Sequence, residues 1–261
     1  MKNVAVKDIE SEQICPSCGK RIYPSDCLRV WEEVTDTISN QSALTRFMNV
    51  VEHIFAIHYI RIIKDFNPQS YIEVLNNLCF FIDGPLAIFG NAAWVHSCIM
   101  KFLHDINFEM QKHNKSPLMI LGLQKSGLVY DYLQLVSRSL PNNVICCLED
   151  DLRNKYISFD RNFGSETYYG QDFLFKTKSG RTFVFNVPYP FRDKAKTTFK
   201  AEKSKIANYS NIGAYTKIIE DFEYDLYENA VIPIALAHKY TAISLEPGGK
   251  VLDLLSKSKM Q

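Results

Sequence analysis

The stretch CFFIDGPLAIFG, residues 79–90, decides the fold. Its first four residues are apolar and predict a short buried strand, and Asp83 and Gly84 follow directly at the tip of that strand. A carboxylate in this place is either a turn former or a metal ligand held above the end of a sheet. An Asp-Gly pair taken alone is more often a turn than a functional site. We therefore looked for further residues that could act with Asp83.

The rest of the chain alternates short apolar runs with longer stretches of helical periodicity. The predicted strands lie at 79–83, 118–123 and 144–148, and the aromatic-rich segment 171–187 predicts a β-hairpin around a Lys-Ser-Gly turn. The predicted helices lie at 43–65, 94–111 and 126–140, with another after Pro233. Strands that alternate with helices favour an α/β fold, and we expect a mixed sheet with mostly parallel central strands, flanked by helices, with a small N-terminal appendage that contains the CxxC.

Composition narrows the class of protein. The chain has 261 residues, 46% of them hydrophobic, and 30 Lys and Arg against 29 Asp and Glu, so no global basic field points to nucleic acid. No apolar run reaches about 18 residues, and the first residues, MKNVAVKDIESEQ, lack the apolar stretch of a signal peptide. Seven cysteines, an odd number, fit free thiols in a reducing compartment better than a disulfide framework. We expect a cytoplasmic protein with no membrane partner.

The N-terminal segment ICPSCGKRIYPSDCLR, residues 14–29, holds a candidate zinc site. Cys15 and Cys18 have the CxxC spacing of a zinc knuckle, and Cys27 is a third candidate ligand. A structural zinc site needs about four ligands, and the sequence has no second CxxC or nearby HxxxH, so the remaining ligands would come from Cys27 or from a symmetry mate across a dimer. A redox role is less favoured, because the CxxC does not sit at a strand-to-helix junction. We divide the chain into a CxxC appendage with a linker, residues 1–42, and a main domain, residues 43–261.

Three residues could join Asp83 in a site. Glu52 lies in the apolar stretch VVEHIFAIHY, where we expect Val51, Ile54 and Phe55 to face the core, so that Glu52 would need a cation or a metal as partner. The alternative is a glutamate on the polar face beside His53.

His238, in PIALAHKYTAIS, could orient a phosphate or a water, although a lone histidine there is more often a satisfied core residue. Lys125 follows the predicted strand LMILGL and could meet a phosphate, although a solvated lysine is the default.

An ordered set of motifs then carries a resemblance. The segments CPSCGKRIYPSDCLR, NVVEHIFAIHYIR, FFIDGPLAIFGNAAW, LGLQKSG, YYGQDFLFKTKSG and NAVIPIALAHKYTAIS follow one another in the order and rough spacing of bacterial NurA-domain proteins, which are DNA-processing nucleases. The resemblance runs from about residue 14 to 255. It rests on the ordered set, since no single motif is decisive.

The resemblance implies an RNase H-like α/β fold whose acidic residues hold Mn²⁺ or Mg²⁺ and cleave phosphodiester bonds in DNA. It also implies a homodimer docked on a hexameric HerA-type ATPase, active in DNA end resection or phage defence. By motif, Asp83 resembles the family's strand-end aspartate, Glu52 the glutamate of the preceding helix, and His238 the histidine of the C-terminal Ala-His motif. Together with Lys125, which joins them through its place at a strand end, these residues form the expected catalytic set of Asp83, Glu52, His238 and Lys125, with Asp83 and Glu52 as the Mn²⁺ or Mg²⁺ ligands.

The chain departs from the family pattern at two points. NurA proteins carry an early Asp-Gly-Ser at the end of an opening strand, whereas this sequence has only NVAVKDIES before its CxxC. In addition, Gln124 stands where related chains often have glutamate. Two functions from different classes are therefore expected: a metal-dependent nuclease, or a catalytically inactive NurA-like subunit that acts as a docking module for the ATPase or for a complete nuclease partner.

Overall fold

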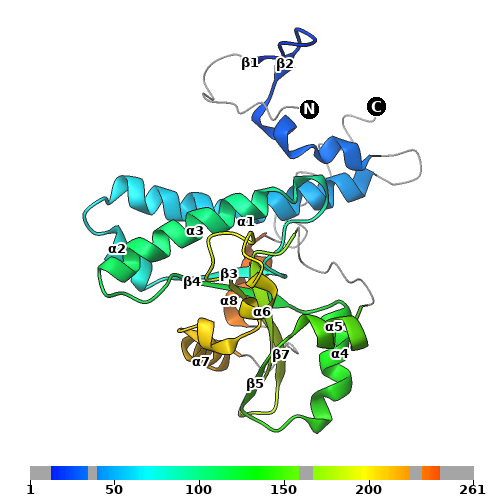
Figure 1. Ribbon diagram of the computed structural model, residues 1–261, viewed down its shortest axis with the longest axis vertical. Coiled ribbons are helices and arrows are strands. Elements are labelled where there is room, and N and C mark those ends of the chain that lie inside the picture. The colour runs from blue at the N-terminus through cyan, green and yellow to red at the C-terminus, as the bar shows by residue number, and fades with distance from the viewer. Residues whose placement is uncertain (1–12, 35–39, 159–166, 224–230, 242–261) are drawn as a thin grey trace.

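The structure is a computed structural model, and it describes residues 13–34, 40–158, 167–223 and 231–241. A five-stranded sheet with the strand order β3-β4-β7-β6-β5 forms the centre, and helices pack on both of its faces (Figure 1). The strands are β3 (Cys79–Asp83), β4 (Met119–Gln124), β5 (Val144–Cys147), β6 (Gly170–Lys176) and β7 (Thr182–Pro188). The α/β class and the positions of the strands and of the hairpin are as the sequence predicts.

Strand directions differ from the expectation. Within the described sheet β3 and β4 form the one parallel pair, and the pairs β4–β7, β7–β6 and β6–β5 are antiparallel. The prediction of mostly parallel central strands is therefore wrong. The cause is the tight hairpin, because the five residues 177–181 reverse the chain between β6 and β7, and β7 then takes the place beside β4. The sheet is mixed.

Most predicted helices are present, and several shorter ones join them. The helices are α1 (Asn40–Phe66), α2 (Tyr71–Asn76), α3 (Val95–Lys112), α4 (Leu128–Val136), α5 (Asp150–Tyr156), α6 (Phe199–Lys203), α7 (Ile212–Phe222) and α8 (Ile232–Thr241). Three short 3₁₀ helices within this domain are η3 (Gly90–Ala92), η4 (Ser137–Ser139) and η5 (Ile206–Asn208). No helix among the described residues combines the length and the apolar character that crossing a membrane requires.

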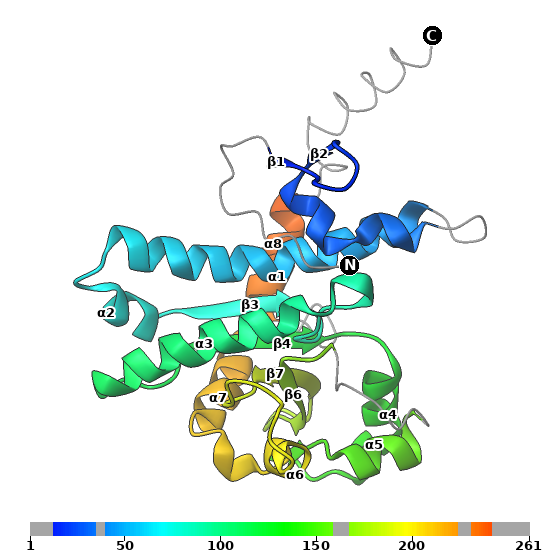
Figure 2. The ribbon, with the colours of Figure 1, turned by 45° about the horizontal axis from the view of Figure 1, so that its top comes forward.

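The two faces of the sheet bury different cores. One face carries the alternate positions that include Phe81, Leu121, Phe173 and Phe185, and α7 and α8 pack against it. On the other face, α1, α2 and α3 cover β3 and β4, whereas α4 and α5 cover the half formed by β5, β6 and β7. The helices α1 and α7 consequently lie on opposite sides of the sheet (Figure 2).

Aromatic side chains dominate the core that α7 and α8 cover. Phe173 and Phe185 stack with ring centroids 5.4 Å apart, and the ring of Tyr209 meets Phe173 edge-on at 5.1 Å. Phe175 and Phe183 lie beside them and are almost fully buried. Each buried phenylalanine contributes about 1.5–3 kcal/mol by leaving water. The hairpin that carries these residues is thus the best anchored part of the sheet.

The appendage consists of a small hairpin and two 3₁₀ helices. The strands β1 (Gln13–Ile14) and β2 (Arg21–Ile22) pair antiparallel, and η1 (Pro24–Leu28) and η2 (Val30–Glu33) follow them. In both views this unit lies beyond the N-terminal half of α1, away from the sheet (Figures 1 and 2). It is fastened there because Leu28 and Val30 join the core that α1 and α3 form, and Glu33 accepts a hydrogen bond from the N–H of Asn91 at 3.0 Å.

A buried histidine fixes α1 against the body of the protein. His53 Nδ1 lies 2.6 Å from the hydroxyl of Tyr169, and only 2% of His53 is exposed. Burial lowers the pKa of His53 to about 4, so the ring is neutral at physiological pH. A buried tyrosine keeps its proton, because burial raises its pKa, and the hydroxyl can therefore donate to Nδ1.

This histidine predicts a specific loss of stability in acid. An unfolded histidine has a pKa near 6.5, above the folded value, so between about pH 6.5 and pH 4 the unfolded chain binds more protons than the folded chain. The contribution of His53 is full above pH 6.5, and it falls by about 1.4 kcal/mol per pH unit below that value. We expect His53→Gln to flatten the dependence of the unfolding free energy on pH between 4.5 and 6.5, measured by urea denaturation.

The matched control is His113→Gln, on an exposed residue at the end of α3. That variant should keep the slope of the unmodified chain. An equal slope in His53→Gln and in the unmodified chain would show that His53 does not carry this dependence.

Candidate functional site

Asp83 lies at the carboxyl end of β3, an outer strand of the sheet. It pairs in register with Leu123 of β4, and the parallel pairing brings the carboxyl ends of both strands to the same edge. Gly84 follows at a φ of 131°, which an L-residue rarely adopts, so the chain turns away at once. About a third of the Asp83 side chain is exposed (31%). The strand thus fixes the direction of a carboxylate that solvent and ligands can reach.

Lys125 meets this carboxylate from the neighbouring strand. It is the first residue after β4, and its Nζ lies 2.8 Å from Asp83 Oδ1. Like Asp83, it is about one-third exposed. An ion pair at this exposure contributes little to stability. The ion pair instead fixes the position of the Lys125 ammonium group, which it holds at the strand end.

His238 closes the other side of Asp83. It comes from α8, which packs on the face of the sheet that carries Phe81, and its Nε2 lies 2.6 Å from Asp83 Oδ2. An ionised carboxylate can only accept, so Nε2 must carry the hydrogen in this contact. Lys125 Nζ lies 3.2 Å from the same nitrogen and is then a neighbouring cation rather than a donor to it. The two oxygens of Asp83 are therefore each engaged by a different basic side chain.

Glu52 reaches the same point from α1. Its Oε1 accepts a hydrogen bond from the backbone N–H of Asp83 at 3.3 Å. Partial desolvation raises the pKa of Glu52 and the negative charge of Asp83 adds to this, whereas the Asp83 N–H, His238 and Lys125 act in the opposite direction. All four residues that the sequence singles out, Asp83, Glu52, Lys125 and His238, therefore converge at the end of β3.

The orientation of α1 differs from the prediction. We expected Val51, Ile54 and Phe55 to face the core, but Ile54 and Phe55 are 38% and 65% exposed, and it is His53 that is buried. The prediction was wrong because α1 is apolar on two opposite faces, so hydrophobic periodicity alone does not say which one faces inward. Glu52 as a whole is an exposed residue of α1, but its carboxylate end turns toward the sheet, where it is partly desolvated and accepts the backbone N–H of Asp83.

The donor atoms of these residues suit a divalent cation in part. Two carboxylates and an imidazole nitrogen form an O, O, N donor set that suits Mn²⁺ and, for its oxygens, Mg²⁺. In the described part of the chain, however, no three His, Cys, Asp or Glu side chains are already arranged as a metal site. Asp83 and Glu52 therefore fit as part of a coordination shell. A cation bound by Asp83 would have to displace Lys125 or His238 from one of its oxygens.

The CxxC cysteines lie together at the tip of the β1–β2 hairpin, far along the chain from this cluster. Cys15 is half-buried and Cys18 is exposed. Cys27, in η1, is exposed and does not complete a group of three metal-ligand side chains with them in the described residues. The structure thus brings two of the three predicted zinc ligands together.

Sequence reasoning missed a buried polar network behind the cluster. On the face of the sheet opposite Phe173, Asp172 accepts hydrogen bonds from Gln124, at 2.6 Å, and from Asn186 and Arg153. All four side chains are less than 10% exposed. Gln124 directly precedes Lys125, so the network holds the strand end from which Lys125 projects. The sequence does contain a signal for this network, because the polar residues Asp172 and Asn186 stand inside runs of aromatic residues that are otherwise typical of a buried strand.

This network predicts a large loss of stability on Asp172→Asn. The change removes the carboxylate that balances the buried guanidinium of Arg153, and breaking a buried ion pair in this way costs about 3–5 kcal/mol. Urea denaturation should show this loss. Adding Arg153→Met to Asp172→Asn removes the second charge and should restore more than half of it. A loss below about 1 kcal/mol in the single variant, a size usual for surface changes, would contradict the account.

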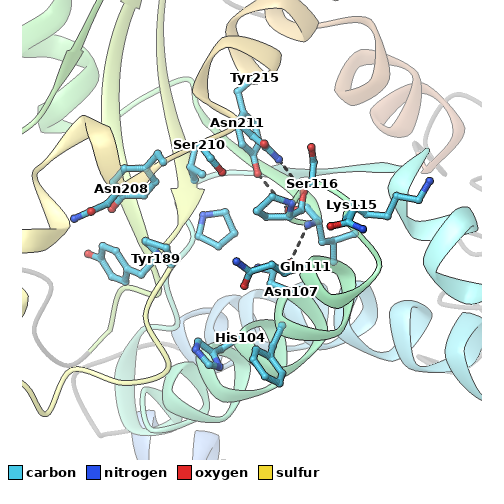
Figure 3. Close-up of a pocket in the computed structure, with 18 residues that line it drawn as sticks. His104, Asn107, Gln111, Lys115, Ser116, Tyr189, Asn208, Ser210, Asn211 and Tyr215 are labelled. Carbon is cyan, nitrogen blue, oxygen red and sulfur yellow. Dashed lines mark hydrogen bonds between the residues drawn. The ribbon is translucent and has the colours of Figure 1, made fainter.

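A well-defined pocket of the described surface lies elsewhere. A pocket of about 610 Å³ sits where α3, the start of β4, the end of β7 and α7 meet, at the opposite end of β4 from Lys125 (Figure 3). Two of its polar side chains hold the backbone at the start of β4. Asn107 accepts the N–H of Leu118 at 2.9 Å, and Asn211 donates to the carbonyl of Pro117 at 2.9 Å. The candidate functional site is accordingly the open cluster around Asp83 and not this pocket.

Comparisons with protein-family models, with curated proteins and with solved structures gave no match. The geometry of the cluster and the motifs that carry it are therefore the basis on which a function is inferred.

Proposed function

We propose that this chain is a NurA-like, metal-dependent deoxyribonuclease that works in the cytoplasm with a HerA-type hexameric ATPase, in DNA end resection or phage defence. One observation carries the proposal. Four residues that are far apart in the sequence, Asp83, Glu52, Lys125 and His238, converge at a single strand end. Two are acids and two are bases, which is the mixture that phosphodiester cleavage uses for its metal and its phosphate.

Each side chain has a role that its position supports. Asp83 and Glu52 would hold Mn²⁺ or Mg²⁺ through oxygen atoms, since hard divalent cations prefer carboxylate ligands. Such a cation, when bound, supplies an activated water and stabilises developing charge on phosphate oxygens. Lys125 and His238 lie beside the carboxylate as cations or hydrogen-bond donors, so they can bind and orient the scissile phosphate.

The RNase H-like assignment belongs to the same proposal. Its support is a five-stranded mixed sheet with helices on both faces and an acidic residue at the end of its parallel pair. The ATPase partner rests on the ordered motifs that resemble NurA proteins.

A second function, that of a catalytically inactive docking subunit, is favoured by a different observation. Each oxygen of Asp83 is already engaged, one by Lys125 at 2.8 Å and the other by His238 at 2.6 Å. In an inactive subunit these contacts would simply hold β4 and α8 to the end of β3. The two functions differ in whether a divalent cation displaces one of the basic side chains.

The nuclease proposal predicts the effect of Asp83→Ala. The variant should lose Mn²⁺-dependent cleavage of linear DNA by at least 100-fold, with the ATPase present, because one of two carboxylate ligands is gone. Folding should change by less than about 1 kcal/mol, since the side chain makes only partly exposed ion pairs. Asp65→Ala is the matched control, because Asp65 is also ion-paired, to Arg61, and lies on the surface of α1.

Two results would overturn this proposal, the first by showing that cleavage does not need Asp83 and the second in favour of the docking subunit. One is full activity in Asp83→Ala. The other is the absence of cleavage by the unmodified chain with Mn²⁺ or Mg²⁺ and with its ATPase present.

The homodimer within this proposal has a candidate surface. Five apolar residues on α1 are 55–79% exposed: Leu44, Met48, Phe55, Tyr59 and Phe66. Their spacing of four and seven residues places them on one face, opposite the buried Val50, His53 and Ile60. The stripe runs about 33 Å along the helix. A second copy of the chain is the occupant that fits, because two identical straight stripes pair about a two-fold axis.

A double substitution on this stripe tests the dimer. Met48→Glu with Phe55→Glu places four like charges at the centre of the expected interface, so the dimer should become a monomer in sedimentation velocity. The buffer contains a strong metal chelator, so that metal-mediated association does not contribute. Leu135→Glu, on an 83% exposed apolar residue of α4, is the control and should remain dimeric. A monomeric unmodified chain under these conditions would contradict the proposed interface.

A further inference from the structure

The CxxC turn of the appendage has a defined backbone geometry. The N–H of Cys15 donates to the carbonyl of Lys20 at 2.8 Å, and the N–H of Gly19 donates to the carbonyl of Cys15 at 2.9 Å. Gly19 has a φ of 70°, in the left-handed region that glycine adopts without strain. The turn therefore reverses tightly between β1 and β2 and holds both cysteines at the tip of the hairpin.

Hydrogen-bond donors surround the sulfur of Cys15. Backbone N–H groups of Ser17 and Cys18 point at its sulfur, and the thiol of Cys18 lies within hydrogen-bond reach of it. A metal ligand must be the thiolate, so donors that stabilise the thiolate favour metal binding.

The number of zinc ligands that one copy of the chain can offer follows from its cysteines and histidines. All seven cysteines and all six histidines of the sequence fall within the described residues. In that part of the chain no third His, Cys, Asp or Glu side chain completes a metal group with Cys15 and Cys18. Structural zinc sites close with four sulfur or nitrogen ligands. One copy of the chain therefore offers two of the four.

We propose that the CxxC turn is half of a zinc site, and that two copies of this chain share one Zn²⁺ through Cys15 and Cys18 of each. A second copy brings the same two sulfurs and so makes the Cys₄ set that zinc prefers. The appendage presents the turn outward, beyond α1 and away from the sheet (Figures 1 and 2). Apolar side chains that a partner could cover stand exposed on the same unit: Ile14 at 61%, Tyr23 at 53% and Trp31 at 63%.

This site is independent of the nuclease proposal. It uses none of the residues around Asp83, and it ties copies together through the appendage rather than through the stripe on α1. Zinc would therefore add a metal-dependent link between two copies. Loss of the link should leave the Asp83 cluster intact.

The test is a titration of the reduced, metal-free chain with Co²⁺ under anaerobic conditions. Cobalt replaces zinc, and thiolate ligation gives a charge-transfer absorption whose intensity rises with the number of sulfurs. Saturation should occur at one ion for every two chains, with the absorption of four thiolates, and Zn²⁺ should displace the cobalt. Cys15→Ser and Cys18→Ser should each lose the absorption.

Cys27→Ser and Cys98→Ser, at two other exposed cysteines, are matched controls and should keep both the absorption and the stoichiometry. Three results would overturn the inference: no thiolate absorption, saturation at one ion per chain, or loss of the absorption in Cys27→Ser. The last two would place the site within a single copy. The readout does not depend on nuclease activity, so failure here and failure of the proposed function are distinguishable.

Discussion

The parallel pairing of β3 with β4 is the constraint on which the candidate site depends. It brings two carboxyl strand ends to the same edge, so that Asp83 and Lys125 meet although 41 residues separate them. The backbone after β3 comes close to β4, and this requires a residue without a side chain at position 122. A Cβ at Gly122 would lie 2.7 Å from the carbonyl oxygen of Gly84. Glycine at this point of β4 therefore lets the chain turn back over the sheet directly after Asp83.

The rest of the site is added to that pair from opposite sides. The helix α8 packs on one face and supplies His238, whereas α1 covers the other face and supplies Glu52. Behind the strand ends, the buried network around Asp172 fixes Gln124 and with it the position of Lys125. A charged cluster that is open to solvent is thus held by a rigid, fully buried support, which is the arrangement that positions functional groups well.

Sequence reasoning succeeded where the signal was local. Apolar runs and a Lys-Ser-Gly turn predicted the strands at 79–83 and 144–147 and the hairpin. The expectation that functional side chains lie at strand ends, together with the motif resemblance, selected the four residues that lie together in the structure. It failed where the answer depended on packing. The inward face of α1 could not be chosen because both faces are apolar, and strand direction depended on where the hairpin inserts. The Asp172 network was hidden because its members come from four separate elements.

The central claim is that the carboxylates at the end of β3 bind a divalent cation in competition with Lys125 and His238. The most direct measurement is Mn²⁺ binding to the purified chain, followed by the loss of the free-ion signal in electron paramagnetic resonance. The account predicts binding by the unmodified chain and by Asp65→Ala, strong weakening in Asp83→Ala and in Glu52→Gln, and tighter binding in Lys125→Met, where the competing cation is gone. Equal binding in all five chains, or none in any of them, would contradict it.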